Sequence, residues 1–342
     1  MKFEGIGIAA TATWIPKTTE SVEDALASGS LSEDDLEGLG VKELPVSEDL
    51  SAVEMAVLAA ESALTRSGVA ATDLDAVAHA WTFHQGYDMW SPPHYIADKL
   101  GAGRRTLPYG IQQSCNGGAT ALLLAAQAHA SDPTSKASLV TTADRFGAPV
   151  WDRWASNPAV PLGDGATAAV IHRVAPSDAL HLLSLAHASA PELWVTREQA
   201  GGFTQFPTWH EGIDARPNRD FYAAGGYEIF RQAAYESVSQ AFAQSLVEAG
   251  LTAADPRIKQ VVLPRLGPRV TGLMFGLAMD EFFPGRALRL GESTGHLGAG
   301  DMLANMHDLV VGGWLEPGDI AVVANGGGGY TWSVAVVEAP LP

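Results

Sequence analysis

Three side chains that together could perform nucleophilic catalysis are spread over the two halves of this 342-residue chain. Cys115, the only cysteine, lies in "QQSCNGGATALLLAA", His296 lies in "STGHLGAGD", and Asp301 closes that second stretch. A thiol can attack an acyl carbon, an imidazole can move the proton, and a nearby carboxylate can orient the imidazole. The combination predicts covalent catalysis on Cys115, with His296 as the base and Asp301 as its orienting residue.

The position of Cys115 favours this chemistry. The apolar run 106–112 predicts a strand and the Ala/Leu-rich run 116–130 predicts a helix, so the thiol lies at a helix start, where the dipole stabilises thiolate. Gly117 and Gly118 permit close approach of another segment. A buried structural cysteine is the plain alternative. In the corresponding alternatives, His296 is a turn residue that serves only packing. Asp301 is then an acid at a helix start, where the helix dipole favours negative charge.

A further glycine-rich stretch, "NGGGGYTW" at 325–332, precedes an alternating segment typical of a strand. It has neither the lysine nor the following helix of a phosphate-binding loop. A glycine-rich turn between two strands instead leaves backbone N–H groups unshielded by side chains. Such groups can form an oxyanion hole.

The elements that must position these residues alternate along the chain. Short β-branched runs and Ala-rich helical runs predict α/β layers around a mainly parallel sheet. Two similar halves, residues 1–175 and 176–342, are expected to meet near "VAPSDA". The aromatic and glycine-containing segment 191–225 has no clean period, which predicts a lid or binding loop, or else a plain surface excursion. We expect strands near 3–10, 75–81, 106–112, 138–143, 166–173, 181–187, 259–263, 287–290, 319–324 and 331–338, and helices near 51–67, 93–101, 116–130, 229–249, 268–280 and 299–312.

Composition excludes several classes of function. The net charge of −18, from 39 acidic and 21 basic residues, disfavours binding to nucleic acid and to anionic membranes. No apolar run approaches the roughly 18 residues that span a bilayer. One cysteine excludes an internal disulfide, and "MKFEGIGIAATATW" lacks a secretory apolar region, so a cytoplasmic protein is expected. Histidine and cysteine spacings typical of zinc sites are missing from the sequence, so no metal is expected.

Three motifs together resemble the signatures of ketosynthase III-type enzymes of the thiolase superfamily. They are "SCNGGATALLLA" around Cys115, "PLGDGATAAVI" at 161–171 and "NGGGGYTWSVAVVE" at 325–338. The resemblance implies a thiolase-like five-layered αβαβα fold from two duplicated halves, a homodimer, and no permanently bound cofactor. It implies an acyl thioester co-substrate carried by coenzyme A or an acyl carrier protein. It also implies that Cys115 is acylated, and that the N–H groups of Cys115 and Gly328 form the oxyanion hole.

Two departures from the family pattern bear on the reaction. Condensing members place a histidine and an asparagine where this chain has Arg265, in "LPRLGPRV", and Glu292, in "GESTGHLGAGD". An enolate needs two neutral or cationic donors, and losing one costs about 3 kcal/mol. The "GHLGAGD" pattern instead resembles a branch that transfers acyl groups to hydroxyls or amines, including sugar acyltransferases of actinobacterial polyketide and antibiotic pathways. That branch implies a triad of Cys115, His296 and Asp301.

The predicted function is therefore ping-pong transfer of a small acyl group, with malonyl as one option, to a hydroxyl of a glycosylated small-molecule acceptor. Arg265 and Arg269 are candidates to bind an acidic carrier protein or a donor carboxylate, with pairing to Glu292 or solvated positions as alternatives. The coenzyme A clamp of the family is not evident in "SGSLSEDDLEGLG", so an acyl-carrier-protein donor stays open. Two other functions remain: a carbon–carbon condensing enzyme that uses His296, and a non-catalytic ketosynthase-like partner subunit.

Overall fold

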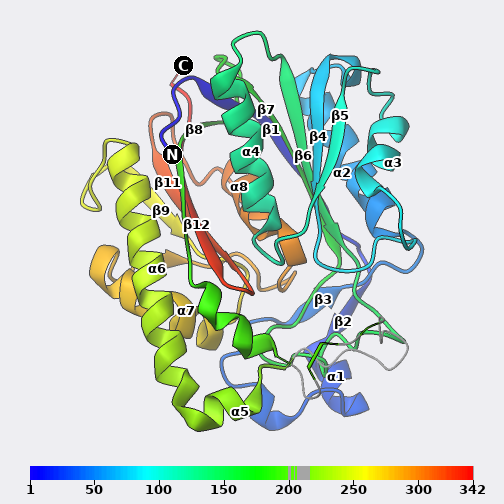
Figure 1. Cartoon of the computed structure of the whole chain (residues 1–342), viewed down its shortest axis with the longest axis vertical. Helices are drawn as coiled ribbons and strands as arrows, with labels where there is room; N and C mark the ends of the chain where they lie inside the picture. Colours follow the sequence, from blue (N-terminus) through cyan, green and yellow to red (C-terminus); the bar gives the residue numbers. More distant parts are fainter. Residues whose placement is uncertain (199–201, 204, 206–215, 342) are drawn as a thin grey trace.

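The computed structural model describes residues 1–198, 202–203, 205 and 216–341, and places ten strands in one sheet. The strands are β1 (Ile6–Trp14), β4 (Leu74–Ala80), β5 (Leu107–Ile111), β6 (Ala137–Asp144), β7 (Gly165–Arg173), β8 (Leu180–Ser189), β9 (Ile258–Val262), β10 (Ala287–Leu288), β11 (Ile320–Gly327) and β12 (Thr331–Glu338). The helices are α1 (Val22–Ser28), α2 (Ala52–Ser67), α3 (Pro92–Lys99), α4 (Gly117–Ser131), α5 (Arg219–Phe221), α6 (Tyr227–Glu248), α7 (Pro268–Phe282) and α8 (Asp301–Val311) (Figure 1).

The strand order repeats in the two halves of the chain. From one edge to the seam the sheet runs β5-β4-β6-β7-β1, and from the other edge it runs β10-β9-β11-β12-β8. The halves meet where β1 pairs with β8, through Gly7 opposite His181 and Ile8 opposite Leu180. This order is the one expected of a duplicated thiolase-like fold. The boundary between residues 175 and 176 stays a prediction.

The sheet is mixed, so the expectation of a mainly parallel sheet was wrong. Only β4 with β5 and β6, and β9 with β10 and β11, pair in parallel. The other pairs are antiparallel. β11 and β12 are joined by only three residues, Gly328 to Tyr330, a connection too short for anything but an antiparallel pair.

Helices separate and cover the two halves of the sheet in five layers. α2 packs on β1, β6 and β7, α6 packs on β8 and β12, and α7 packs on α6. Between the two halves lie α4 and α8, which contact each other (Figure 1). The central core therefore draws on both halves: it contains Ile8, Ile171, Leu185 and Val323 from strands, with Leu122 of α4 and Met302 of α8. Burial on several sides explains why α4 consists largely of alanine, leucine and glycine.

The predicted long elements are confirmed to within a few residues of their ends, whereas one insertion was not predicted. Residues 19–45 contain α1 and a small two-stranded sheet of β2 (Thr19–Ser21) and β3 (Glu43–Pro45). Its buried Leu44 packs in a cluster with Trp154 from the loop after β6. Part of the predicted lid at 191–225, namely 199–201, 204 and 206–215, lies outside the described residues. Its described beginning is a 3₁₀ helix, Pro191–Arg197.

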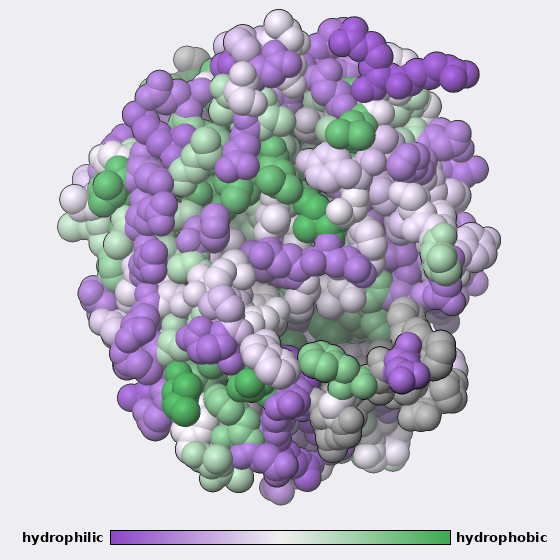
Figure 2. Space-filling view, in the orientation of Figure 1, coloured by the Kyte–Doolittle hydropathy of each residue, from purple (hydrophilic) through white to green (hydrophobic). Residues whose placement is uncertain are grey.

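The surface in Figure 2 is hydrophilic over most of the face shown, with hydrophobic residues in scattered small groups. Among the residues that the structure describes, no helix combines the length and apolarity needed to cross a membrane. The same part of the chain contains no cluster of three or more His, Cys, Asp or Glu side chains able to hold a metal ion.

Candidate active site

Cys115 lies on a tight turn between β5 and the first residue of α4. The preceding Ser114 has a left-handed φ of 48°, a conformation that a non-glycine residue adopts only when its surroundings hold it there. Asn325 of β11 donates through Nδ2 to the carbonyl oxygen of Cys115 at 3.0 Å. Cys115 is half-buried as a residue, and Ser114 Oγ lies 3.8 Å from its Sγ. The turn thus presents the sulfur at a helix start, as the sequence predicts.

His296 and Asp301 form a buried pair beside this thiol. The Nδ1 atom of His296 lies 2.7 Å from Asp301 Oδ2, and the two residues are 2% and 0% exposed. Asp301 also accepts hydrogen bonds from Leu297 N at 2.9 Å and from Arg265 N at 2.7 Å. The carboxylate therefore fixes the imidazole, and with Nδ1 engaged, the Nε2 side is left for the neighbouring Cys115 thiol, with which His296 interacts electrostatically.

The charges in this group support a thiolate and an imidazolium. Burial by itself would raise the pKa of the Cys115 thiol, but attraction to His296 and hydrogen bonding with His296 and Ser114 together outweigh burial and lower the pKa. Burial would lower the pKa of His296, yet the neighbouring Asp301 and Cys115 raise that pKa well above its usual value. His296 and backbone N–H donors lower the pKa of Asp301 against its burial. An activated nucleophile of this kind can attack an acyl carbon.

The "PLGDG" motif holds the histidine by its backbone. Gly163 N donates to His296 O at 3.1 Å, and His296 N donates to Pro161 O at 3.2 Å. A Cβ on Gly163 would lie 2.1 Å from the carbonyl oxygen of Thr294, so this contact requires glycine. The motif thus positions the base, although none of its side chains belongs to the proposed triad.

Two buried carboxylates that the sequence analysis missed brace this region. Asp164 accepts from Ser47 N, from Phe146 N and from both Nη atoms of Arg153. Asp144, at the end of β6, accepts three backbone N–H groups, and burial raises its pKa to about 6 despite those donors. The only sequence signal for Asp144 was an acid at the end of an apolar run, which is also how an ordinary loop begins, whereas Asp164 lies in the "PLGDG" motif without a role assigned to its side chain.

The glycine turn between β11 and β12 lies against the nucleophile. A Cβ on Gly327 would lie 2.5 Å from Asn116 N, and a Cβ on Gly328 would lie 3.6 Å from Ser114 Oγ. This proximity is what the predicted oxyanion hole of Cys115 and Gly328 N–H groups needs. Their role as donors stays a prediction.

The surroundings of Arg265 bear on its role in binding substrate, which stays a prediction. Arg265 is 4% exposed, and its guanidinium donates to Asn305 at 3.1 Å, to Thr294 at 3.0 Å and to Asp308. These three side chains occupy each of its nitrogens, so it braces α8 instead of facing a donor carboxylate.

Two related expectations involve exposed residues. Glu292 does not pair with Arg265, because its carboxylate is exposed and lies 3.0 Å from Lys42 Nζ. Arg269 is exposed at the start of α7, and its predicted contact with a carrier or donor stays untested.

Comparison with known proteins places this geometry among acyl-transfer enzymes. The family model for 3-oxoacyl-[acyl-carrier-protein (ACP)] synthase III matches residues 109–189. Among solved structures, ChlB3, described as an acyltransferase, is 31% identical and covers 99% of each chain, with a TM-score of 0.85. The 3-oxoacyl-[acyl-carrier-protein] synthase III from Aquifex aeolicus VF5 is 19% identical, with a TM-score of 0.77 over 98% of this chain and 100% of that chain. Acetoacetyl CoA synthase NphT7 from Streptomyces sp. (strain CL190) is 26% identical over 350 residues, 99% of both proteins.

Proposed function

Because the chain belongs to the 3-oxoacyl-[acyl-carrier-protein] synthase III-like family of the thiolase superfamily, we propose that it is a ping-pong O-acyltransferase. Its donor is an acyl thioester, and its acceptor is a hydroxyl on a sugar or another natural product. The observation that carries this proposal is the buried pair of His296 and Asp301, with Nδ1 and Oδ2 2.7 Å apart, whose charges act on the pKa of the neighbouring Cys115 thiol. That arrangement suits two successive proton transfers around one acyl-enzyme.

In the first half-reaction the Cys115 thiolate attacks the thioester carbonyl. The carbonyl oxygen becomes an oxyanion, for which the N–H groups of Cys115 and Gly328 are the proposed donors. The tetrahedral intermediate then collapses, breaking the bond between carbon and the donor sulfur. His296 gives its proton to the departing thiolate, which leaves a neutral imidazole and an acylated Cys115.

In the second half-reaction His296 is the base. Acylation removes the negative charge of the thiolate, one of the groups that raise the pKa of His296, so the neutral imidazole persists beside Asp301. It takes the proton of the acceptor hydroxyl, whose oxygen attacks the acyl carbon. The second intermediate expels the Cys115 thiolate, forms the ester and regenerates the imidazolium.

Decarboxylative condensation is the competing reaction, and NphT7 carries the name of a condensing enzyme. Against it stands Arg265, which replaces the expected histidine and is turned into a buried network with Asn305 and Asp308. Glu292, near the expected asparagine, is exposed and paired with Lys42. Neither side chain supports an enolate at Cys115. A non-catalytic partner subunit, the other alternative, would not need a cysteine with a lowered pKa.

The finer identity of the substrates and the assembly are parts of the same proposal. Malonyl is the proposed acyl group, and either coenzyme A or an acyl carrier protein can carry it. A homodimer fits the exposed edge of the sheet, where β5 has no further neighbour among the described strands and Leu107 is 62% exposed.

The type of bond formed decides between ester formation and condensation. The enzyme is given malonyl thioester labelled in its free carboxyl group, together with a hydroxylated glycoside. Acyl transfer predicts that the label stays in a product that hydroxide cleaves. Release of one equivalent of labelled carbon dioxide, with a base-stable carbon–carbon product, would overturn the proposal.

A further inference from the structure

Ser114, the residue before the nucleophile, carries a hydroxyl group that has no part in the two half-reactions described above. Its Oγ donates a hydrogen bond to Cys115 Sγ at 3.8 Å. Among the residues that the structure describes, this is the one hydrogen bond of the Ser114 side chain. A neutral sulfur atom is a weak acceptor, whereas an oxygen that carries negative charge is a strong one. The hydroxyl can therefore serve a better acceptor once the sulfur is acylated.

The backbone of Ser114 is held in an unusual conformation. Its φ of 48° lies in the left-handed region. Two backbone hydrogen bonds fix the turn: Asn116 N donates to Gln113 O at 3.1 Å, and Gly117 N donates to Ser114 O at 3.0 Å. Non-glycine residues in this region carry backbone strain and are concentrated at functional sites. The strain points to a role for the side chain, because glycine would adopt the same turn without it.

The glycine turn between β11 and β12 approaches the same hydroxyl from the other half of the chain. A Cβ on Gly328 would lie 3.6 Å from Ser114 Oγ, which is an ordinary van der Waals separation. Gly327 is in tighter contact, since a Cβ there would lie 2.5 Å from Asn116 N. The Ser114 hydroxyl therefore adjoins both the sulfur and the glycine whose N–H group is a proposed oxyanion donor.

This small region lies at the boundary between the core and the surface. Ser114, Cys115 and Gly328 are each half-buried, whereas Asn116 and Gly327 beside them are buried. An oxyanion formed on an acyl group at Cys115 is separated from the sulfur by one carbon atom. A donor 3.8 Å from the sulfur can therefore come within the distance of about 2.7–3.1 Å that a hydrogen bond to the oxyanion needs.

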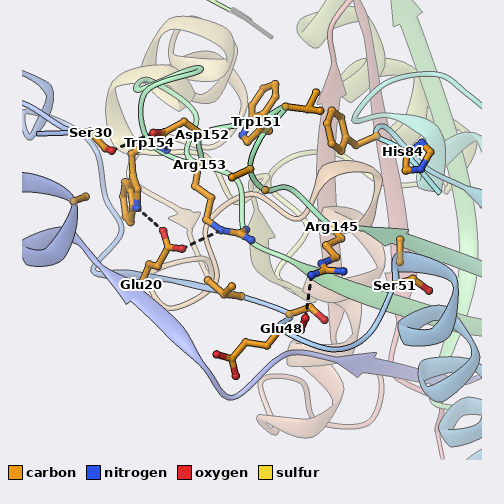
Figure 3. Close-up of a pocket in the computed structure, with 18 of the residues that line it drawn as sticks. Glu20, Ser30, Glu48, Ser51, His84, Arg145, Trp151, Asp152, Arg153 and Trp154 are labelled. Carbon is orange, nitrogen blue, oxygen red and sulfur yellow. Dashed lines mark hydrogen bonds and ion pairs between the residues drawn. The ribbon is translucent and has the colours of Figure 1, made fainter. Parts of the chain in front are cut away.

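A cavity of about 990 Å³ beside the insertion at residues 19–45 is a separate feature. Figure 3 shows its walls, which include Arg145 and Trp151 from the loop after β6. Neither Ser114 nor Cys115 lines it. A substitution at Ser114 leaves the walls of this cavity unchanged, so its effect can be assigned to the thiol and its surroundings.

We propose that the Ser114 hydroxyl is a third donor to the oxyanion, beside the N–H groups of Cys115 and Gly328. This assignment rests on the proposed acyl-enzyme chemistry at Cys115 and extends it to a side chain. In the resting enzyme the hydroxyl donates to the thiolate. When the sulfur bonds to the acyl carbon, the π electron pair of the carbonyl moves to oxygen, and the hydroxyl donates to that oxygen instead. Ser114 keeps its proton throughout, and the leaving thiolate takes its proton from His296.

Two reactions of Cys115 separate an effect on the thiolate from an effect on the oxyanion. Hydrogen bonding from Ser114 helps to lower the pKa of the Cys115 thiol, so removal of the hydroxyl also changes the thiolate fraction. Iodoacetamide alkylates the thiolate at a saturated carbon and forms no oxyanion. p-Nitrophenyl acetate acylates it through an oxyanion and releases p-nitrophenolate, whatever the natural donor is. Both rates are measured on the full chain against pH, up to the plateau at which the thiol is fully ionised.

In Ser114→Ala the plateau rate of acylation should fall on the order of 100-fold, the usual effect of losing one oxyanion donor. The plateau rate of alkylation should stay within about twofold of the parent, and its midpoint should move to higher pH. Ser114→Gly should behave in the same way, because both variants lose the hydroxyl. Ser131→Ala, which removes an exposed hydroxyl at the far end of α4, should match the parent. Mass spectrometry confirms the adduct on Cys115, with Cys115→Ala as the blank.

Three outcomes would overturn the proposal. Ser114→Ala could keep the parental plateau of acylation, its acylation and alkylation could fall by the same factor, or Ser114→Gly could restore the acylation rate that Ser114→Ala loses. The second result would give Ser114 a structural role, and the third would assign the loss to the backbone. If circular dichroism shows that Ser114→Ala is unfolded, Ser114→Gly carries the comparison with the parent, with the same expected ratio.

The probe ester also separates this proposal from the proposed function. The expected loss of acylation in Ser114→Ala, with a parental acyl-enzyme that gives its acyl group to no hydroxyl acceptor, would support the third donor and reject the acyltransferase. Transfer to a glycoside by the parent, with Ser114→Ala acylated at the parental plateau rate, would reject the third donor alone.

Discussion

Asp144 accepts a hydrogen bond from Ala299 N at 3.1 Å and so joins the end of β6 to the glycine turn between His296 and Asp301. Its other carboxylate oxygen accepts from Thr82 N at 2.8 Å and from Phe83 N at 2.7 Å. One buried side chain from the first half of the chain thus braces the turn that carries the proposed base. Asp144 touches none of the reacting atoms, so it is a positioning residue.

The first prediction concerns the pH dependence of stability. The pKa of Asp144 is raised by burial from 3.8 to about 6. The folded state therefore favours the protonated acid, and the stability contributed by this residue is fully present below pH 4 and lost as the pH rises through 6. The shift corresponds to about 3 kcal/mol. Denaturant unfolding of the parent and of Asp144→Asn at pH 4, 5 and 7 should show their difference falling by that amount. A difference independent of pH would contradict the prediction.

A second prediction compares two glycines with left-handed φ. Gly298 has φ +58°, and a Cβ there would lie 2.1 Å from Asp144 Oδ2, whereas Gly313 has φ +64° and nothing within 4 Å. Gly313→Ala should cost about 1–2 kcal/mol from backbone strain and leave acylation unchanged. Gly298→Ala should cost a further 1–3 kcal/mol, roughly, and slow acylation, because the turn must move. Equal effects on both measurements would mean that the contact with Asp144 has no role.

The third prediction tests the activation of the thiol. Attraction to His296 lowers the pKa of Cys115, while burial opposes that change. In His296→Ala burial and the negative charge of Asp301 both favour the neutral thiol and only the Ser114 hydroxyl opposes them, so the thiol pKa should rise to the ordinary value of about 8.5 or above. The rate of iodoacetamide alkylation against pH, followed by mass spectrometry, reports this pKa without interference, since no other cysteine exists. Superimposable profiles would exclude His296 as the activating group.

A fourth prediction separates the two half-reactions. Donor thioester should add one acyl mass to Cys115, and Cys115→Ala should abolish the adduct. His296→Ala should slow transfer from a preformed acyl-enzyme on the order of 100-fold or more. Asp301→Asn should cost less or comparably, because it orients the base and stabilises its charged form. Transfer at the parental rate by both variants would show that the proposed triad is wrong.

The fifth prediction distinguishes the two arginines. Arg265→Met removes the partner of Asp308, Asn305 and Thr294 and should cost about 3 kcal/mol of folding free energy. Arg269→Met changes an exposed residue and should stay within about 0.5 kcal/mol. Chemical denaturation gives both values. A stable Arg265→Met protein with a raised KM for the donor would return Arg265 to substrate binding.

The sequence predicted the long elements well, because helical and alternating hydrophobic periods persist over many residues in α2, α6 and β12. It predicted the direction of the strands wrongly, because the alternation of hydrophobic residues is the same in parallel and antiparallel neighbours. The insertion at 19–45 was missed because its strands are three residues long and carry no period.

The sequence indicated the residues of the proposed triad but not the buried side chains that hold them in position. Cys115, His296 and Asp301 stand out through glycine-rich surroundings and a resemblance to known motifs. Asp144 and Asp164 are functional only through contacts with segments far away in the chain, which no local pattern encodes. The buried contacts of Arg265 were not predicted for the same reason, since Asp308 and Asn305 reach it from α8.

The nucleophile and its base lie in loops that are far apart in the sequence, and Asn325 of β11 holds the backbone of Cys115. A molecule whose second half has not yet folded therefore has an ordinary thiol, without a partner to lower its pKa. Such an unfinished molecule would neither capture acyl groups from a metabolic pool nor stall as a dead-end adduct. If the proposed function holds, only completed enzyme would consume activated acyl donor.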